Sequence, residues 1–428
     1  MPTHSGRPSR RALLGGLVAG GAAFAIGAPP AIGQAAPRVV VVGGGFAGAS
    51  CARALKRQDR SLAVTLVEAS ADYTACPFSN AVIGGLRDIS AQRFSYQGLA
   101  KDEIQIVPRQ AIAVDPQRRE LRLDDGNVIG YTRLVLAPGI ELRFDAIPGY
   151  DQAAAELLPH AWKAGEQTVL LRRQLEAMED GGVVILAAPP NPFRCPPRPY
   201  ERASLIAHYL KTHKPRSKLL ILDAKDAFSK QRLFEAAWAE LYPGMIEWIS
   251  LSFGGKVVEV DAKTRTLSTD FGDHRGDVVN VIPPQRAGAI ATAAGVADQT
   301  GWCPIDPATF ESRLQSGIHV IGDAAIAGAM PKSAFAANGQ AKACAAAVAK
   351  LVRGETPPAP KLINTCYSLV APDYGISIAG VYQPKDGLLA EVPGAGGVSP
   401  LDVPREVRAL EAAYAEGWFR TITADVFG

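Results

Sequence analysis

The stretch Arg38-Val39-Val40-Val41-Val42-Gly43-Gly44-Gly45-Phe46-Ala47-Gly48 decides the fold of this chain. Four consecutive valines predict a strand buried on both faces, and the glycines after them predict a tight turn into a helix. In this G-x-G-x-x-G pattern the first glycine permits the turn, the second lets backbone approach a pyrophosphate, and the third lets the helix pack on the strand. The phosphates are then expected at the free N–H groups of the helix N-terminus. The predicted dinucleotide contacts in this stretch are Gly43, Gly45, Phe46, Ala47 and Gly48.

An acidic residue follows at the distance that a ribose site requires. The run Ala63–Val67 predicts a second strand, and Glu68 ends it, twenty residues after Gly48. A carboxylate at this position accepts hydrogen bonds from a ribose hydroxyl. Strand, helix and acid at these distances favour dinucleotide binding over the alternative, a glycine-rich turn without a ligand.

Composition indicates a globular enzyme of two or three domains. The chain has 428 residues, of which 47% are apolar and 20% charged, enough for a large core. Its formal charge of +3 comes from residues 1–35, which carry Arg7, Arg10 and Arg11 but no acid. Without these three arginines, 42 basic residues balance 42 acidic ones. This balance does not favour nucleic-acid binding.

Residues 1–35 resemble a twin-arginine export signal. Arg10 and Arg11 precede a charge-free, glycine-rich apolar run to Ala28, and small residues follow near Ala35, where cleavage is expected. The alternative is an uncleaved membrane anchor, but the run is shorter than the roughly 20 strongly apolar residues that a span needs. We therefore predict a periplasmic protein, exported folded with its cofactor and without stable membrane insertion. The oxidising periplasm also permits disulfides.

A second α/β unit follows, but its nucleotide-binding turn is replaced. Buried strands are predicted at 182–188 and 218–223, with a helix at 200–213 between them. The turn after the first of these strands, residues 189–199, contains six prolines and no glycine. Proline lacks the N–H group that a phosphate needs. The turn therefore opposes NAD(P)H as a substrate.

The chain then returns to the first unit. The strand at 317–321 ends in Gly322 and Asp323. An aspartate here commonly accepts a hydrogen bond from the ribityl chain of a flavin; the alternative is a carboxylate that caps the next helix. An alanine-rich helix at 330–350 starts near Lys332, whose charge is expected at the reducible edge of the flavin.

The predicted fold class is α/β, with two Rossmann-like dinucleotide-binding domains and a small C-terminal α+β domain. The FAD-binding domain is split over 36–147 and 276–356, and an NAD-binding-like domain without a nucleotide fingerprint occupies 148–275. Residues 357–428 form the C-terminal interface domain. No Cys-x-x-Cys-His motif occurs, so this chain holds no c-type haem, and no metal site is predicted.

Together these motifs resemble the flavoprotein subunit of flavocytochrome c sulfide dehydrogenase, a relative of sulfide:quinone oxidoreductases built like glutathione reductase. The resemblance covers essentially the whole chain after residue 35. It is carried by the fingerprint at 43–48, the run Pro159–Gly165, the run Cys195–Glu201, the Gly301–Pro304 turn and Cys366. It implies bound FAD, sulfide as the substrate and a c-type cytochrome subunit as the partner in a heterodimer.

The resemblance implies roles for three cysteines and one acid. Cys76, followed by Asn80 in the family pattern, matches the cysteine that attaches FAD covalently through its 8α-methyl group. Cys195 and Cys366 match the redox-active pair beside the isoalloxazine. Glu201 matches a carboxylate near that pair, which would act as general base. The alternative for Glu201 is a first-turn acid that interacts with the helix dipole.

The residues around these positions agree with the implied roles. Cys366 lies 171 residues after Cys195, and Arg194 and Arg198 flank Cys195, where they would stabilise a thiolate. A disulfide closing so long a loop could instead be structural, worth on the order of several kcal/mol. Trp418 matches a family aromatic near the flavin, with core packing as its alternative. Buried core or turn positions are expected for Cys51, Cys303 and Cys344.

The implied reaction is sulfide oxidation. Hydrosulfide would open the disulfide and leave a persulfide on one cysteine, and the thiolate of the other would donate to the flavin at C4a. Three rival interpretations remain open. They are a periplasmic sulfide:quinone oxidoreductase, an NAD(P)H-dependent disulfide reductase-like flavoprotein, and a flavin-binding electron-transfer component whose disulfide is only structural.

Overall fold

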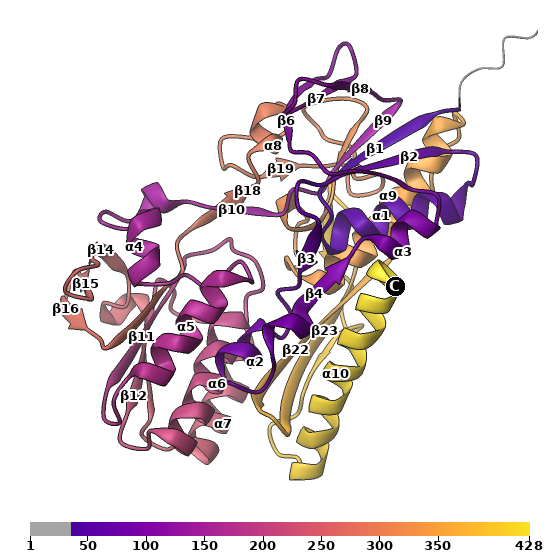
Figure 1. The fold of residues 1–428 in the computed structure, drawn as a ribbon. Helices are drawn as coiled ribbons and strands as arrows, with labels where there is room; N and C mark the ends of the chain where they lie inside the picture. Colours follow the sequence, from indigo (N-terminus) through magenta and orange to yellow (C-terminus); the bar gives the residue numbers. More distant parts are fainter. Residues whose placement is uncertain (1–35) are drawn as a thin grey trace, which may run out of the picture. The chain divides into compact units, whose positions relative to one another are not determined.

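The computed structural model of this protein describes residues 36–428. Residues 1–35, with the predicted twin-arginine signal, lie outside the described residues, so export to the periplasm stays a prediction. The described chain forms two parallel sheets, and a C-terminal antiparallel sheet with one long helix (Figure 1). This arrangement confirms the predicted α/β class with two Rossmann-like units and a C-terminal α+β part.

The first parallel sheet is built around the valine strand. Its strand order is β20-β9-β1-β2-β5, and Val39, Val40 and Val41 are fully buried at its centre. A central strand of a parallel sheet has both faces covered, which is why consecutive valines fit there. The strands are β1 (Arg38–Val42), β2 (Ala63–Val67), β5 (Gln105–Val107), β9 (Arg133–Leu136) and β20 (Ile318–Val320).

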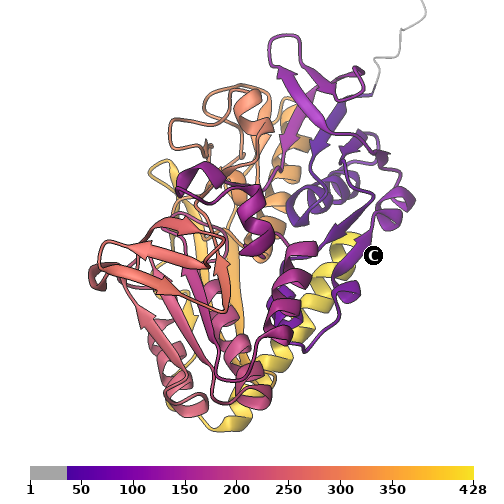
Figure 2. The ribbon, with the colours of Figure 1, turned by 60° about the vertical axis from the view of Figure 1, so that its left-hand side comes forward.

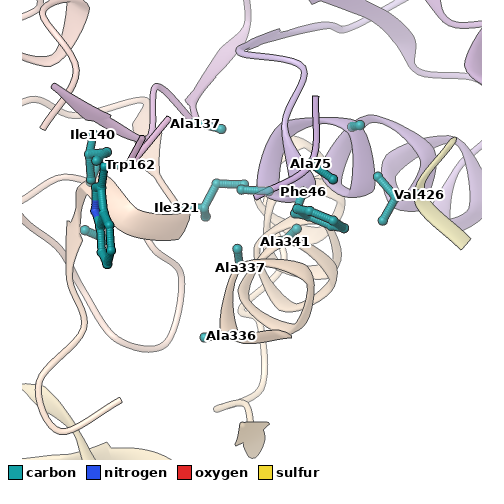
Figure 3. Packing of buried hydrophobic residues seen from close by; sticks show 14 of the residues in the cluster. Phe46, Ala75, Ala137, Ile140, Trp162, Ile321, Ala336, Ala337, Ala341 and Val426 are labelled. Carbon is teal, nitrogen blue, oxygen red and sulfur yellow. The ribbon is translucent and has the colours of Figure 1, made fainter. Parts of the chain in front are cut away.

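Two helices pack against each other beside this sheet (Figure 1). Helix α1 (Phe46–Gln58) begins directly after the glycine turn, and α9 (Ala334–Val352) is rich in alanine, whose small side chains allow close approach. Figure 3 shows Phe46 of α1 beside Ala341 of α9 and Val426, all members of one buried cluster. This packing places the glycine turn at the end of β1.

The second parallel sheet has the order β13-β12-β11-β17. Its strands are β11 (Val183–Ala188), β12 (Lys218–Asp223), β13 (Ile246–Ile249) and β17 (Val278–Val281). The proline-rich turn connects β11 to α6 (Arg198–His213), the helix that a Rossmann fold would place under a nucleotide. The scaffold of a second dinucleotide domain is therefore complete.

One antiparallel strand pair joins the two parallel sheets. The chain leaves the first domain through β10 (Ile140–Leu142) and returns through β18 (Gln285–Ala287), which lies beside it (Figure 1). The return follows β17, so the second domain extends beyond the predicted boundary at residue 275. β17 is the short run Val-Val-Asn-Val, and its composition does not show to which parallel sheet it belongs.

The C-terminal part bridges the other two. Helix α10 (Arg405–Phe427) packs along β23, and its end returns to the first domain (yellow in Figures 1 and 2). There Arg53 Nη1 donates to the backbone oxygen of Gly428 at 2.6 Å. Strand β22 contacts α6 of the second domain. The strands of this part are β22 (Leu362–Ala371), β23 (Tyr374–Lys385), β24 (Leu388–Glu391) and β25 (Gly397–Val398).

Shorter elements complete the chain. Small antiparallel sheets are formed by β3 (Asp72–Thr74) with β4 (Arg93–Ser95), β6 (Ala111–Asp115) with β7 (Glu120–Leu123) and β8 (Val128–Gly130), and β14 (Val257–Asp261) with β15 (Thr266–Thr269) and β16 (Gly272–Arg275). β19 (Cys303–Pro304) pairs with β21 (Ala325–Ile326). The remaining α-helices are α2 (Ser79–Ile83), α3 (Gln97–Lys101), α4 (Gln152–Leu157), α5 (Glu166–Ala177), α7 (Gln231–Leu241) and α8 (Ile290–Ala293). Within residues 36–428 no helix is both long and apolar enough to cross a membrane.

The third glycine of the fingerprint gives a stability prediction. A Cβ at Gly48 would lie 1.8 Å from the backbone oxygen of Gly43, so Gly48→Ala must push α1 away from the turn. We expect a loss of at least about 1–3 kcal/mol, the usual cost of overpacking, together with a reduced flavin content. Thermal unfolding and flavin absorbance measure both.

The matched control is Gly417→Ala in α10. A Cβ there meets no atom within 4 Å, so this variant should be stabilised by about 0.5–1 kcal/mol, because alanine is the better helix former. Equal unfolding temperatures for the two variants would contradict the close helix–turn contact.

Candidate active site

A cavity of about 540 Å³ lies where the three parts of the chain meet. It is lined by the glycine turn, the proline-rich turn, β22 and α10. The predicted site residues on its wall are Gly43, Gly45, Phe46, Ala47, Glu68, Cys76, Cys195, Glu201, Asp323, Cys366 and Trp418. The other predicted site residues, which lie behind the wall, are Gly48, Asn80, Gly322 and Lys332.

The glycine turn forms one end of the cavity. Gly43 has a φ of +101°, and a Cβ there would lie 2.3 Å from the backbone oxygen of Ala137, so only glycine fits. The Glu68 carboxylate accepts from the backbone N–H of Gly44 at 2.6 Å and from that of Ser70 at 2.9 Å. These two bonds hold the carboxylate at the turn, where a ribose hydroxyl would reach it.

Asp323 and Arg194 leave hydrogen-bonding atoms free on the same wall. Asp323 Oδ1 and Arg194 Nε are buried and have no hydrogen-bond partner within residues 36–428. Asp323 Oδ2 lies 3.9 Å from Arg194 Nη1. Burial raises the pKa of Asp323, and Arg194 opposes this shift. Buried polar atoms are normally paired, so an acceptor and a donor left over beside a dinucleotide turn fit FAD, which carries hydroxyl and phosphate groups.

Lys332 does not direct its charge into the cavity, contrary to the prediction. Its ammonium donates to the backbone oxygens of Asp323 and Ala325, both at 2.8 Å, and lies 4.0 Å above the ring of Trp302. Burial lowers the pKa of Lys332 to about 8. Lys332 therefore supports the loop that carries Asp323, a role that depends on contacts with distant backbone.

The first turn of α9 closes another side of the cavity. Ser333 caps this helix by accepting from the backbone N–H of Ala336 at 3.0 Å, and its hydroxyl donates to Asn364 Oδ1 of β22 at 2.6 Å. Ala334 and Phe335 line the cavity. The positive end of the α9 dipole therefore faces the site.

Cys195 and Cys366 reach the cavity from different domains. Cys195 has a φ of +58°; its N–H donates to Lys332 O at 2.7 Å, and its carbonyl accepts from Arg198 N at 2.9 Å. The Cys366 sulfur accepts from Asn364 Nδ2 at 3.3 Å. Burial raises the pKa of both thiols. All six cysteines are free thiols in the structure, so the Cys195–Cys366 disulfide stays a prediction.

Glu201 lies beside this cysteine pair in the first turn of α6. Its carboxylate accepts from Asn80 Nδ2 at 2.7 Å and from the backbone N–H of Leu369 at 3.0 Å. Burial raises the pKa of Glu201, which suits a group that must take up a proton. Asn80, predicted as a flavin contact, instead lies behind Glu201 and accepts from Arg202 Nε at 3.1 Å.

Cys76 lies in a positively charged surrounding that the sequence did not reveal. Its thiol donates to the backbone oxygen of Trp162 at 3.8 Å, and this oxygen also accepts from Arg194 at 2.5 Å and Arg198 at 3.0 Å. Burial alone would raise the pKa of Cys76, but the Arg194 and Arg198 guanidiniums outweigh it and lower that pKa. The lowered pKa favours the thiolate, which is the nucleophilic form of cysteine. The sequence alone shows Arg194 and Arg198 only as neighbours of Cys195 and not of Cys76.

In the second Rossmann unit, the acid at the position of a ribose-binding carboxylate is hydrogen-bonded to other protein groups. Asp223, the acid at the end of its second strand, accepts from Tyr200 Oη at 2.5 Å, from Trp248 Nε1 at 3.0 Å and from the Lys225 ammonium. The rings of Tyr200 and Phe228 stack with centroids 3.6 Å apart. The carboxylate that would bind a ribose thus accepts hydrogen bonds from Tyr200, Trp248 and Lys225 instead. This agrees with the proline-rich turn, which lacks the N–H groups that a phosphate needs.

Three protein-family models match successive parts of the chain. The family model for the central part of the sulfide dehydrogenase [flavocytochrome c] flavoprotein chain matches residues 168–283. The family model for the flavin-binding part of flavocytochrome c sulphide dehydrogenase matches residues 358–427. That of the pyridine nucleotide-disulphide oxidoreductase matches residues 37–177.

Similar solved structures agree with the architecture. The sulfide:quinone oxidoreductase of Aquifex aeolicus superposes with a TM-score of 0.74 at 16% identity, covering 91% of this chain and 92% of that one. The covalent putidaredoxin reductase–putidaredoxin complex gives a TM-score of 0.65 at 18% identity, with 92% and 94% covered. At these identities the likeness concerns the fold alone.

Curated relatives show the family. The mitochondrial sulfide:quinone oxidoreductase of Mus musculus is 23% identical over 304 residues, 67% of this chain and 65% of the mouse protein, slightly less than two thirds of its length. The sulfide dehydrogenase [flavocytochrome c] flavoprotein chain of Chlorobaculum thiosulfatiphilum is 62% identical over 45 residues, 10% of this chain and 94% of that sequence. With the two family-specific models, this likeness shows that the chain belongs to the family of flavocytochrome c sulfide dehydrogenase flavoprotein chains, within the pyridine nucleotide-disulphide oxidoreductase superfamily.

Proposed function

We propose that this protein oxidises hydrosulfide to sulfur or polysulfide with FAD and a Cys195–Cys366 redox pair, in the periplasm, and passes the electrons to a c-type cytochrome subunit. One observation carries the proposal. Two cysteines 171 residues apart line the same cavity as a dinucleotide-binding glycine turn. In the oxidising periplasm, which the twin-arginine pattern of residues 1–35 favours, such a pair would rest as a disulfide.

The residues around the pair supply the remaining chemistry. Hydrosulfide attacks one sulfur of the disulfide, and the sulfur–sulfur bond between the cysteines breaks. Glu201, buried beside the pair, takes the proton of the bound sulfur species. FAD, when bound, supplies the two-electron oxidation and releases the electrons one at a time. Asp323 and the glycine turn hold the cofactor, and Arg194 balances its negative charge.

We also propose that FAD is attached covalently to Cys76. The arginine-stabilised thiol at this position lines the cavity, and thiolates are the reactive form of cysteine. Trp162 orients the thiol through its carbonyl oxygen at 3.8 Å. A covalent link would keep the cofactor in place during export and turnover.

The electron acceptor is a separate molecule, because the chain has no Cys-x-x-Cys-His motif. A c-type cytochrome subunit is the family solution and the one we propose. The alternative is a quinone, as in the oxidoreductases of Mus musculus and Aquifex aeolicus to which the chain is similar.

The redox role of the cysteine pair is tested by anaerobic sulfide titration. We expect sulfide to bleach the flavin absorbance of the native protein, and Cys195→Ser to abolish the bleaching because no disulfide remains to be opened. Cys51→Ala is the matched control, since Cys51 is buried in α1 away from the cavity wall. Retained bleaching in Cys195→Ser would show that the cysteine pair has only a structural role. Fast bleaching by NADH but not by sulfide would indicate an enzyme that uses a pyridine nucleotide.

Covalent attachment is tested by mass spectrometry of the denatured chain. The native protein should carry the added mass of FAD on the peptide that contains Cys76. Cys76→Ala should release its flavin on denaturation while still binding it when folded, because the glycine turn and Asp323 are unchanged. A native chain without added mass would contradict the proposed bond.

The acceptor is tested with the sulfide-reduced protein. Co-purification with a haem-absorbing subunit and rapid reduction of that haem are expected. The measurement is the haem absorbance after sulfide addition, compared with the reduction of decylubiquinone under the same conditions. Equal or faster quinone reduction would identify a quinone as the electron acceptor in place of the cytochrome. The proposed cysteine chemistry would not change.

A further inference from the structure

Lys230 is a buried lysine with no role in the site described above. It directly precedes α7 and is 7% exposed. Its backbone has a φ of +62°, a left-handed conformation that costs free energy in a residue other than glycine. Its ammonium donates to Cys366 O at 2.9 Å, Ser368 Oγ at 2.8 Å and Ile376 O at 3.3 Å. The charge is thus fixed beneath the strand that carries Cys366.

This charge has no conventional partner. Its hydrogen-bond acceptors are all uncharged, and within residues 36–428 no carboxylate oxygen lies within 4.0 Å of the ammonium. Lys225, another buried lysine, is by contrast paired with Asp223. An unpaired buried ammonium is costly, because neutral oxygens replace its hydration only in part. The buried charge of Lys230 therefore lowers the free energy of unfolding, and an anion close to the ammonium would offset this cost.

The ionisable groups that face Lys230 come from three elements. They are Cys366 on β22, Cys195 and Glu201 at the start of α6, and Glu411 on α10. Burial lowers the pKa of Lys230 to about 8, and these groups oppose the shift. Among these groups Cys366 opposes the shift most strongly, and Lys230 in turn lowers the pKa of Cys366 against the effect of burial.

We propose that Lys230 is a positioning residue whose positive charge stabilises the thiolate of Cys366 when the cysteine pair is reduced. The inference rests on the proposed sulfide oxidation. Hydrosulfide forms a bond to the Cys195 sulfur, the Cys195–Cys366 bond breaks, and the electron pair of that bond remains on the Cys366 sulfur. Asn364 donates to the same sulfur at 3.3 Å. The buried ammonium then gains the anion that it lacks in the structure.

The test measures the Cys366 thiol in the FAD-containing protein, without sulfide. The protein is reduced with dithiothreitol and alkylated with iodoacetamide at a series of pH values, and the Cys366 peptide is quantified by mass spectrometry. Lys230→Met removes the charge and keeps the apolar stem. An opposite charge nearby typically shifts a pKa by about 1–3 units, so the alkylation profile should move upward by at least about one unit. Alkylation at neutral pH should slow about tenfold.

Two further variants separate charge from anchoring. Ser368→Ala removes one hydrogen bond of the ammonium but keeps the charge, so its profile should stay at the native position. Lys230→Gln retains hydrogen-bond donors without charge and should behave like Lys230→Met, which also covers the case that the methionine variant does not fold. An unchanged profile in the folded charge-removing variants, or an equal shift in Ser368→Ala, would overturn the inference.

The test distinguishes a failure of the role of Lys230 from a failure of the proposed function. If the profile shifts but the native protein does not oxidise sulfide, the electrostatic role stands and the proposed activity fails. If sulfide bleaches the flavin but Lys230→Met and Lys230→Gln leave the profile unchanged, the activity stands and the role of Lys230 fails.

Discussion

One buried carboxylate connects the three parts on which the site depends. Glu201 of the second domain accepts from Asn80 of the first domain and from the backbone of Leu369 in the C-terminal sheet. Because hydrogen bonds to a buried carboxylate are strong and costly to leave unmade, this junction has essentially one arrangement. It places Cys366 at the start of α6, beside Cys195, and it closes the cavity between them. The proposed base and the scaffold of the thiol pair are thus the same group.

The electrostatics of the cavity are organised for negative charge. Arg194 and Arg198 converge on the Trp162 carbonyl near Cys76, and the N-terminus of α9 adds its dipole from another side. Lys230 adds an unpaired ammonium behind Cys366. A buried cation without a matching carboxylate costs stability, and an anion bound beside it offsets part of that cost. FAD phosphates, a reduced flavin and a cysteine thiolate are such anions, and the proposed reaction provides all three.

The second domain keeps the fold of a dinucleotide-binding domain but carries a cysteine in the turn that would hold phosphate. Its parallel sheet and α6 are retained, but Asp223 is used by Tyr200, Trp248 and Lys225. The turn that would hold phosphate holds Cys195 instead, in a left-handed conformation between two backbone hydrogen bonds.

Sequence alone determined the two Rossmann units, the flavin turn and the absence of a second nucleotide fingerprint, because these rest on local patterns: four valines, spaced glycines and six prolines. The site residues came from the same local motifs and from the family resemblance. Tertiary structure decided what depends on distant contacts: that β17 belongs to the second sheet, that Asn80 supports Glu201, that Lys332 binds backbone oxygens, and that Lys230 lies beneath Cys366. A side chain's partners are set by packing between segments far apart in sequence, and no local pattern encodes them.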